Sequence, residues 1–135
     1  MGGRYFTPEE ANELLASVRP LAERMVAHRR ALTAAERRQG ELIARIAGNG
    51  SMRRRELATA REEAKREAAA LARCVEAIHE LGGLVKDLER GLVDFPARRG
   101  EEEVLLCWHV GEDEITHWHG VEEGFGGRKP LPLDD

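Results

Sequence analysis

Aromatic residues are scarce in this chain of 135 residues. They make up 4% of it, and no Phe, Tyr or Trp occurs between Phe6 and Phe95. So little aromatic surface argues against a β-sandwich, whereas 34% charged residues and many Ala and Leu are typical of a helical protein. The length favours one domain, which we expect to cover residues 1–135.

The chain also has few cysteines and no long apolar run. Cys74 and Cys107 are its two cysteines, too few for a disulfide framework, and this favours a reducing compartment. No apolar stretch approaches the roughly 18 residues that a membrane-spanning helix needs, and the first residues lack the apolar segment of a signal peptide. We therefore expect a cytoplasmic protein with no membrane partner.

The net charge of −4 conceals two regions of opposite sign. Residues 28–66 hold eleven Lys or Arg against five Glu, whereas residues 98–135 hold four Lys or Arg against ten Asp or Glu. The basic region includes Arg53-Arg54-Arg55, a run that together with Arg29, Arg30, Arg37 and Arg38 could contact the phosphates of a nucleic acid. Acidic residues are interspersed there, and no aromatic residues are available to stack on bases. A nucleic-acid partner is therefore the less favoured interpretation.

Residues 7–82 have the pattern of a long, coiled-coil-like helical hairpin. Thr7 can cap the first helix, Pro8 suits its first position, and Glu10 completes a capping box. From there apolar residues recur at alternating spacings of four and three, the seam of a coiled coil. Pro20 interrupts this seam and should kink the helix.

The remainder of the chain has the alternation typical of strands. We predict a four-stranded antiparallel meander over residues 84–120, because the connecting turns are short. The predicted strands are Leu84–Leu88, Leu92–Ala97, Val104–Val110 and Ile115–His119. Residues 121–135 are a Gly- and Pro-rich tail, which Phe125 could anchor to the body. The predicted fold class is α+β, with the hairpin packed on the sheet face that carries Trp108 and Trp118.

The hairpin is predicted to be longer than the sheet is wide. A turn at residues 48–51 and a stop at Gly82-Gly83 divide it into two helices, with Leu42 facing Leu57. A first helix of about 40 residues is roughly 60 Å long, whereas four strands side by side span about 20 Å. The distal half of the hairpin therefore extends beyond the sheet. We expect a second copy of the chain to cover its apolar seam in a homodimer.

The sheet face opposite the tryptophans carries the residues with the most chemistry. Alternation places Cys107, His109, His117 and His119 on it. Cys and His hold zinc, and pairs on adjacent strands can converge on one ion, with Cys107 expected opposite His119. The paired CxxC spacing of common zinc sites is absent from the sequence. The alternative is a polar sheet face in which Cys107 packs as a small apolar residue and His119 hydrogen-bonds a carboxylate such as Asp94.

Four further polar residues of the sheet region are Lys86, Asp87, Asp94 and Glu112. They could be catalytic carboxylates and a lysine, yet no nucleophile, base and orienting group fall into one arrangement. Asp87 and Glu112 stand at turns, where a carboxylate commonly accepts hydrogen bonds from nearby backbone N–H groups. The sequence therefore favours a protein that is not an enzyme.

Several motifs together resemble a known family. They are Tyr5–Leu15 (YFTPEEANELL), Val85–Leu88 (VKDL), Gly91–Ala97 (GLVDFPA), Leu106–Trp108 (LCW), Gly111-Glu112, Trp118-His119 and Gly124–Arg128 (GFGGR). Over roughly residues 5–131 the chain resembles small, stand-alone bacterial proteins that form a domain family of unknown function. The resemblance implies no activity. It matches Lys86, Asp87, Asp94, Cys107, Glu112 and His119 to the polar pattern of the family, in which the positions of His109 and His117 vary.

The sequence thus supports three functional hypotheses. The first is a non-enzymatic interaction or scaffold module that acts as a homo-oligomer through its hairpin. The alternative is a zinc-binding protein that uses the Cys/His face of the sheet, and the third is a nucleic-acid binder with a basic hairpin tip. Zinc is the one cofactor expected, and the sequence identifies no protein partner or substrate.

Overall fold

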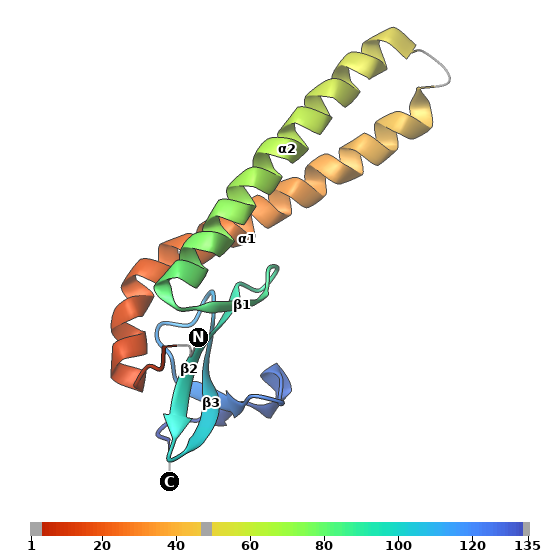
Figure 1. The fold of residues 1–135 in the computed structure, drawn as a ribbon. Coiled ribbons are helices and arrows are strands. Elements are labelled where there is room, and N and C mark those ends of the chain that lie inside the picture. Colours follow the sequence, from red (N-terminus) through yellow and green to blue (C-terminus); the bar gives the residue numbers. More distant parts are fainter. Residues whose placement is uncertain (1–3, 47–49, 134–135) are drawn as a thin grey trace.

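Two long helices dominate the fold. A computed structural model describes residues 4–46 and 50–133. Helix α1 (Pro8–Arg45) and helix α2 (Gly50–Leu81) run side by side as an antiparallel hairpin (Figure 1). The predicted hairpin is confirmed, and its predicted turn lies partly outside the described residues, which omit 47–49. Over the part that is described, neither helix is long and apolar enough to span a membrane.

The predicted start of α1 is confirmed in detail. The Thr7 side chain accepts a hydrogen bond from the Glu10 backbone N–H at 3.1 Å, and the Glu10 carboxylate accepts one from the Thr7 N–H at 2.9 Å. Pro8 occupies the first turn, where a helix leaves N–H groups without partners. Pro20 lies inside α1, and the N-terminal turns of α1 bend away from the line of the rest of the helix (Figure 1). A proline inside a helix removes one backbone bond and explains such a bend.

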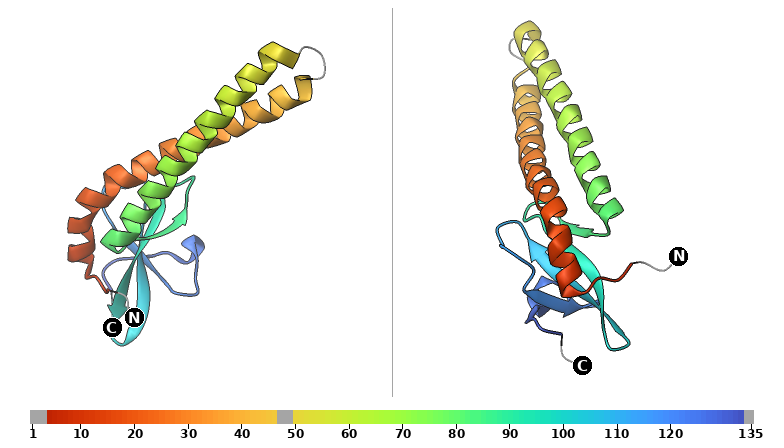
Figure 2. Two further views of the ribbon diagram at one scale, coloured as in Figure 1. Left: turned by 45° about the horizontal axis from the view of Figure 1, so that its top comes forward. Right: turned by 90° about the vertical axis from the view of Figure 1, so that its left-hand side faces the viewer.

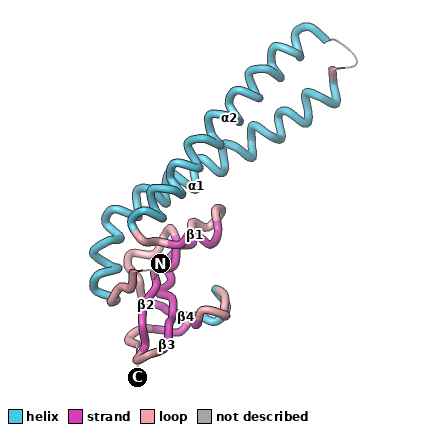
Figure 3. Tube along the Cα trace, in the orientation of Figure 1, coloured by secondary structure: helices cyan, strands magenta, loops and turns pink. Residues whose placement is uncertain are grey.

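Five strands follow the hairpin and form one antiparallel sheet in chain order (Figure 3). They are β1 (Leu84–Asp87), β2 (Leu92–Arg99), β3 (Glu102–His109), β4 (His117–Gly120) and β5 (Lys129–Pro130). The antiparallel meander is confirmed, but the predicted count of four strands is wrong. The tail folds back beside β4, where the Leu131 N–H donates to the Thr116 carbonyl at 2.9 Å. A two-residue strand that contains a proline has no alternation by which the sequence could reveal it.

One face of the sheet packs on the proximal hairpin, which we define as residues 8–32 and 71–81. Trp108 is fully buried there and Trp118 is 7% exposed, in one core with Leu15 of α1 and Ile78 of α2. The predicted burial of both tryptophans is confirmed. The opposite face of the sheet is therefore the one that carries the candidate site.

The distal hairpin, residues 33–45 and 50–70, projects beyond the sheet (Figures 1 and 2). Leu42, Leu57 and Ala60 form a buried cluster of their own, with Ile46 packed against it. The predicted meeting of Leu42 and Leu57 is confirmed. Among the described residues this cluster comes from the two helices alone, and it has fewer buried apolar side chains than the core of the proximal hairpin.

Candidate metal centre

The strand pairing brings Asp94, Cys107 and His119 together. Asp94 of β2 is the direct partner of Cys107 of β3. On the other side of β3, Leu105 is opposite His119 and Cys107 is opposite His117. The predicted register, with Cys107 opposite His119, is therefore wrong by two residues. A shift of two keeps every side chain on its face, because the period of a strand is two.

The register differs because the loop between β3 and β4 is held against α1. The Ile115 N–H donates to Asn12 Oδ1 at 2.7 Å, and Asn12 Nδ2 donates to the Ile115 carbonyl at 3.3 Å. Ile115 is buried in the core beside α1. Arg19 Nη1 also donates to the Glu112 carbonyl at 2.8 Å. These contacts remove residues 115 and 116 from the predicted strand, so β4 begins at His117.

The three side chains form a compact buried group. His119 Nε2 lies 3.1 Å from Asp94 Oδ2. One possible ligand atom from each of Asp94, Cys107 and His119 lies within 4.8 Å of the other two. All three residues are at most 3% exposed. Asp94 Oδ1 is buried and has no hydrogen-bond partner among the described residues.

Burial disfavours the charged forms of two members of the group. Burial raises the pKa of the Asp94 carboxyl, and the nearby His119 opposes that rise only in part. Burial, with the negative charge of Asp94, raises the pKa of the Cys107 thiol to about 12. Without a cation the Cys107 side chain is therefore a neutral thiol at physiological pH.

The tautomer of His119 follows from its second hydrogen bond. Nδ1 lies 2.8 Å from the carbonyl oxygen of Gly120. A carbonyl only accepts hydrogen bonds, so Nδ1 must carry a proton and donate it. Nε2 is then the ring nitrogen that faces Asp94 Oδ2, 3.1 Å away. Histidines that bind metals commonly donate their other N–H to a carbonyl in this way.

A small cavity of about 110 Å³ lies beside the group. Asp94 and His119 line it together with Lys86, Leu92, Leu105 and the tail residues Val121, Glu123, Gly124 and Phe125. The tail therefore covers the route from solvent to the buried carboxyl and imidazole. Phe125 holds this segment in place as predicted, because its ring lies 5.9 Å from that of His109 and 4.7 Å from the Arg128 guanidinium carbon.

The other two predicted ligands lie outside the buried group. His109 Nδ1 is 2.8 Å from the Val110 carbonyl oxygen, and His109 Nε2 is 3.8 Å from Glu112 Oε1. His117 Nδ1 is 2.8 Å from the Thr116 hydroxyl. Both histidines are half-buried. Of the four residues that the sequence proposed for a metal, the structure thus joins Cys107 and His119, and it adds Asp94.

The carboxylates of Asp87 and Glu112 accept hydrogen bonds from nearby backbone N–H groups, as expected. Asp87 Oδ1 accepts hydrogen bonds from the backbone N–H groups of Glu89 and Arg90 at 2.8 and 3.0 Å. These bonds lower the pKa of Asp87. Glu112 Oε1 accepts one from the His109 N–H at 3.0 Å, and the Glu112 carboxylate also pairs with Arg128 at 2.8 Å.

The sequence identifies Asp94 as a polar candidate but not as one of the predicted metal ligands. The signal lay in Leu92–Ala97, where Asp94 is the single charged residue of an otherwise uncharged segment. A charged residue in a buried strand needs a partner. That partner sits on a strand whose position depends on pairing across the whole sheet.

The fold and the site define an α+β protein with a buried Asp–Cys–His group on the outer face of a small sheet. By its sequence the chain belongs to the family described as "Uncharacterized conserved protein (DUF2203)", whose model matches residues 4–131. The predicted resemblance to a family of unknown function is confirmed to that extent. No curated protein and no solved structure matches the chain significantly.

Proposed function

We propose that the protein binds a transition-metal ion, best suited to zinc, through Asp94, Cys107 and His119. The observation that carries this proposal is the closeness of the three ligand atoms, all within 4.8 Å of one another in a buried site. Zinc–ligand bonds are about 2.0–2.3 Å, so donor atoms on one ion lie roughly 3–4 Å apart. A small shift of the three side chains would accommodate the ion.

The charges of the ligands suit a divalent cation. As a thiolate and a carboxylate, Cys107 and Asp94 bring two negative charges, which a doubly charged ion cancels. Either anion alone would be costly at this depth. Sulfur and imidazole ligands favour zinc over magnesium or calcium. The ion would also satisfy the buried Asp94 Oδ1, which lacks a partner among the described residues.

The proposed role is binding rather than catalysis. Three protein ligands leave a fourth position for water or for another side chain. His117, directly opposite Cys107, or His109 could complete the set after rotating its side chain. The adjoining cavity of about 110 Å³ holds water but is smaller than pockets that enclose substrates.

Zinc titration of the metal-free protein tests this proposal. We expect zinc to raise the melting temperature of the wild type, because the ion binds only the folded site. Cys107→Ser, His119→Ala and Asp94→Asn should each lose that increase, whereas His28→Ala, which removes a histidine of the hairpin, should keep it. Metal analysis of protein made without a histidine tag should find one zinc ion per chain. An equal response of all variants, or none from the wild type, would make the group structural.

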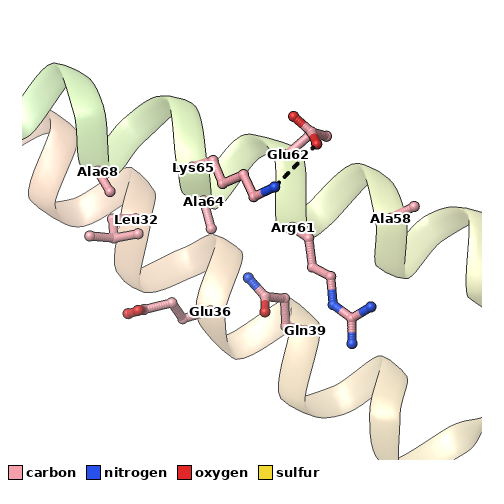
Figure 4. A pocket seen from close by; sticks show the side chains of 9 residues that line it. All are labelled: Leu32, Glu36, Gln39, Ala58, Arg61, Glu62, Ala64, Lys65 and Ala68. Atoms are coloured by element: carbon pink, nitrogen blue, oxygen red, sulfur yellow. Dashed lines mark ion pairs between the residues drawn. The ribbon is translucent and has the colours of Figure 1, made fainter.

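We also propose that the protein is a homodimeric interaction module, because a large apolar side chain of the distal hairpin, Ile43, is exposed beyond the reach of its own sheet. Ile43 of α1 is 54% exposed. It continues the helix face of Leu32, Glu36 and Gln39, since these positions are spaced by three and four residues. The three residues line a groove of about 580 Å³ between the helices (Figure 4). Helix α2 contributes small apolar residues and charged residues to its lining, namely Ala58, Ala64, Ala68, Arg61, Glu62 and Lys65.

Sedimentation of a charged variant tests the dimer. Ile43→Glu should shift the protein from dimer to monomer at micromolar concentration, raising the dissociation constant about ten-fold or more as an apolar contact is lost on each copy. The side chain is exposed, so the substitution should leave the monomer folded. Val121→Glu is the matched control, because Val121 is 51% exposed but lies in the tail. A wild type that sediments as a monomer would exclude the dimer.

A cytoplasmic location is part of the same proposal. Cys74 and Cys107 are both free and buried, which suits a reducing compartment. We propose no nucleic-acid partner, because acidic residues alternate with the basic ones along the hairpin and the helices carry no aromatic residue on which bases could stack.

A further inference from the structure

Four arginines gather around one hollow on the side of the hairpin. The hollow has a volume of about 530 Å³ and lies between α1 and the turn that joins β1 to β2. Its lining consists of Arg29, Arg30, Thr33, Ala34 and Arg37 of α1 with Glu89 and Arg90 of the turn. Four arginines thus line the hollow together with one acidic residue, Glu89. We propose that this hollow binds a small ligand that carries two or more linked phosphates.

The fold holds these side chains in place. Arg29 and Arg30 lie on the same side of α1 as Arg37, because separations of eight and seven residues are close to two helical turns. Asp87 Oδ1 accepts the N–H groups of Glu89 and Arg90 and so fixes the β1–β2 turn. That turn lies beside α1 (Figures 1 and 2). The sequence suggests phosphate contacts for the α1 arginines but could not bring Arg90 to them, because Arg90 is more than fifty residues further along the chain.

The arginines of the hollow lack the acidic partners that other arginines of this protein have. Arg38 pairs with Glu56 at 3.1 Å, and Arg128 pairs with Glu112 at 2.8 Å. Within residues 4–46 and 50–133, neither Arg29, Arg30 nor Arg37 makes an ion pair with a carboxylate. The Nε of Arg29 is buried and has no hydrogen-bond partner in the same residues. An anion would supply the missing acceptor and offset the repulsion between the guanidinium groups.

The N–H donors of the four arginines suit a phosphate ligand in number and in geometry. A guanidinium group offers a planar fork of N–H donors that matches the oxygens of a phosphate and binds two of them at once. Several such groups around a recess can neutralise more charge than one phosphate carries. The Thr33 hydroxyl already donates its proton to the Arg29 carbonyl at 3.0 Å, so it has no proton left to donate to a phosphate. The arginines therefore provide the recognition.

A second hollow continues from the first and could take the rest of the ligand. It has a volume of about 570 Å³ and shares Arg30, Glu89 and Arg90 with the arginine hollow. Its other lining residues are Val26, His109, Val110 and Phe125, which are apolar or aromatic. An organic ring attached to the phosphates would lie against these side chains. A free phosphate chain and a ring-bearing one share the proposed chemistry, and the experiment separates them.

Calorimetric titration of the full chain with tripolyphosphate and with ATP, without metal ions, tests the proposal. We expect saturable binding of one ligand per chain that weakens as salt is added. Arg30→Gln with Arg37→Gln should weaken both ligands by about ten-fold for each arginine removed, as charged hydrogen bonds are lost. Both side chains are exposed, so the double variant should fold. Arg38→Gln removes a neighbouring cation that faces Glu56, and it should bind like the wild type.

The pattern across the ligands decides between the outcomes. Binding of ATP that exceeds tripolyphosphate and falls to its level in Phe125→Ala would assign the second hollow to the ring. Equal binding of the two would assign recognition to the phosphate chain alone, and both results support the proposal. A lack of saturable binding, or the same loss in Arg38→Gln as in the double variant, would overturn it. The double arginine variant, on which the proposal stands or falls, leaves the metal site unchanged, because neither Arg30 nor Arg37 lines the cavity beside Asp94 and His119.

Discussion

The Cys107 thiol has a pKa well above its usual value. It is fully buried, and burial with the charge of Asp94 raises its pKa from 9.0 to about 12. In the unfolded chain the thiol loses its proton near pH 9, whereas in the folded protein it keeps the proton until about pH 12. The folded state therefore binds more protons over this interval. Stability from the neutral thiol is complete below pH 9 and is lost as the pH rises towards 12.

Urea unfolding at alkaline pH, with a chelator present, tests this ionisation. Above pH 9 the free energy of unfolding of the wild type should fall more steeply than that of Cys107→Ala, by up to about 1 kcal/mol per pH unit. Groups common to both proteins cancel in the comparison. Parallel curves for the two proteins would mean that the thiol ionises in the folded state as freely as in the unfolded chain.

Among the structural elements, those with local signals could be predicted from the sequence. The start of α1 needs only Thr7, Pro8 and Glu10, which are adjacent, and all three act as predicted. The face that each strand presents follows from alternation, so the burial of Trp108 and Trp118 was also predictable. Each of these features is decided by residues that lie within a few positions of one another.

Elements that depend on distant contacts were not predictable in the same way. The register of β4 is set by Asn12, which binds Ile115 from a helix about one hundred residues earlier in the chain. The β5 strand exists only because the tail returns to Thr116 and His117. Alternation fixes the face of a residue but leaves open its position along the neighbouring strand.

The candidate site also has a part that local sequence patterns predict and a part that depends on distant contacts. Cys107 and His119 share a face through local alternation, so the sequence could propose them together. Their meeting with Asp94 requires β2, β3 and β4 to pair in one register, and that register depends on the contact with α1. The predicted contact of His119 with a carboxylate such as Asp94 is confirmed at 3.1 Å. Whether a cation takes the place of the Cys107 proton is the question that the zinc titration addresses.

Taken as a whole, the molecule has a well-packed end and a slender one. The proximal hairpin shares its core with the sheet, whereas the distal hairpin has the cluster of Leu42, Leu57, Ala60 and Ile46. Apolar burial supplies most of the free energy that holds helices together, at about 25 cal/mol per Å². The distal helices should therefore open locally without unfolding of the sheet.

Hydrogen exchange on the Ile43→Glu variant, which should be monomeric, tests this difference between the two ends. We expect backbone amides of the distal hairpin to exchange at least about ten-fold faster than those of the proximal hairpin and of β2 and β3, because local opening of the distal helices breaks fewer apolar contacts. In the wild type at high concentration the distal amides should slow down while those of the sheet stay unchanged, since a second copy would cover only the distal surface. Uniform exchange along both helices of the variant would contradict the argument, because it would mean that the hairpin and the sheet unfold as one cooperative unit.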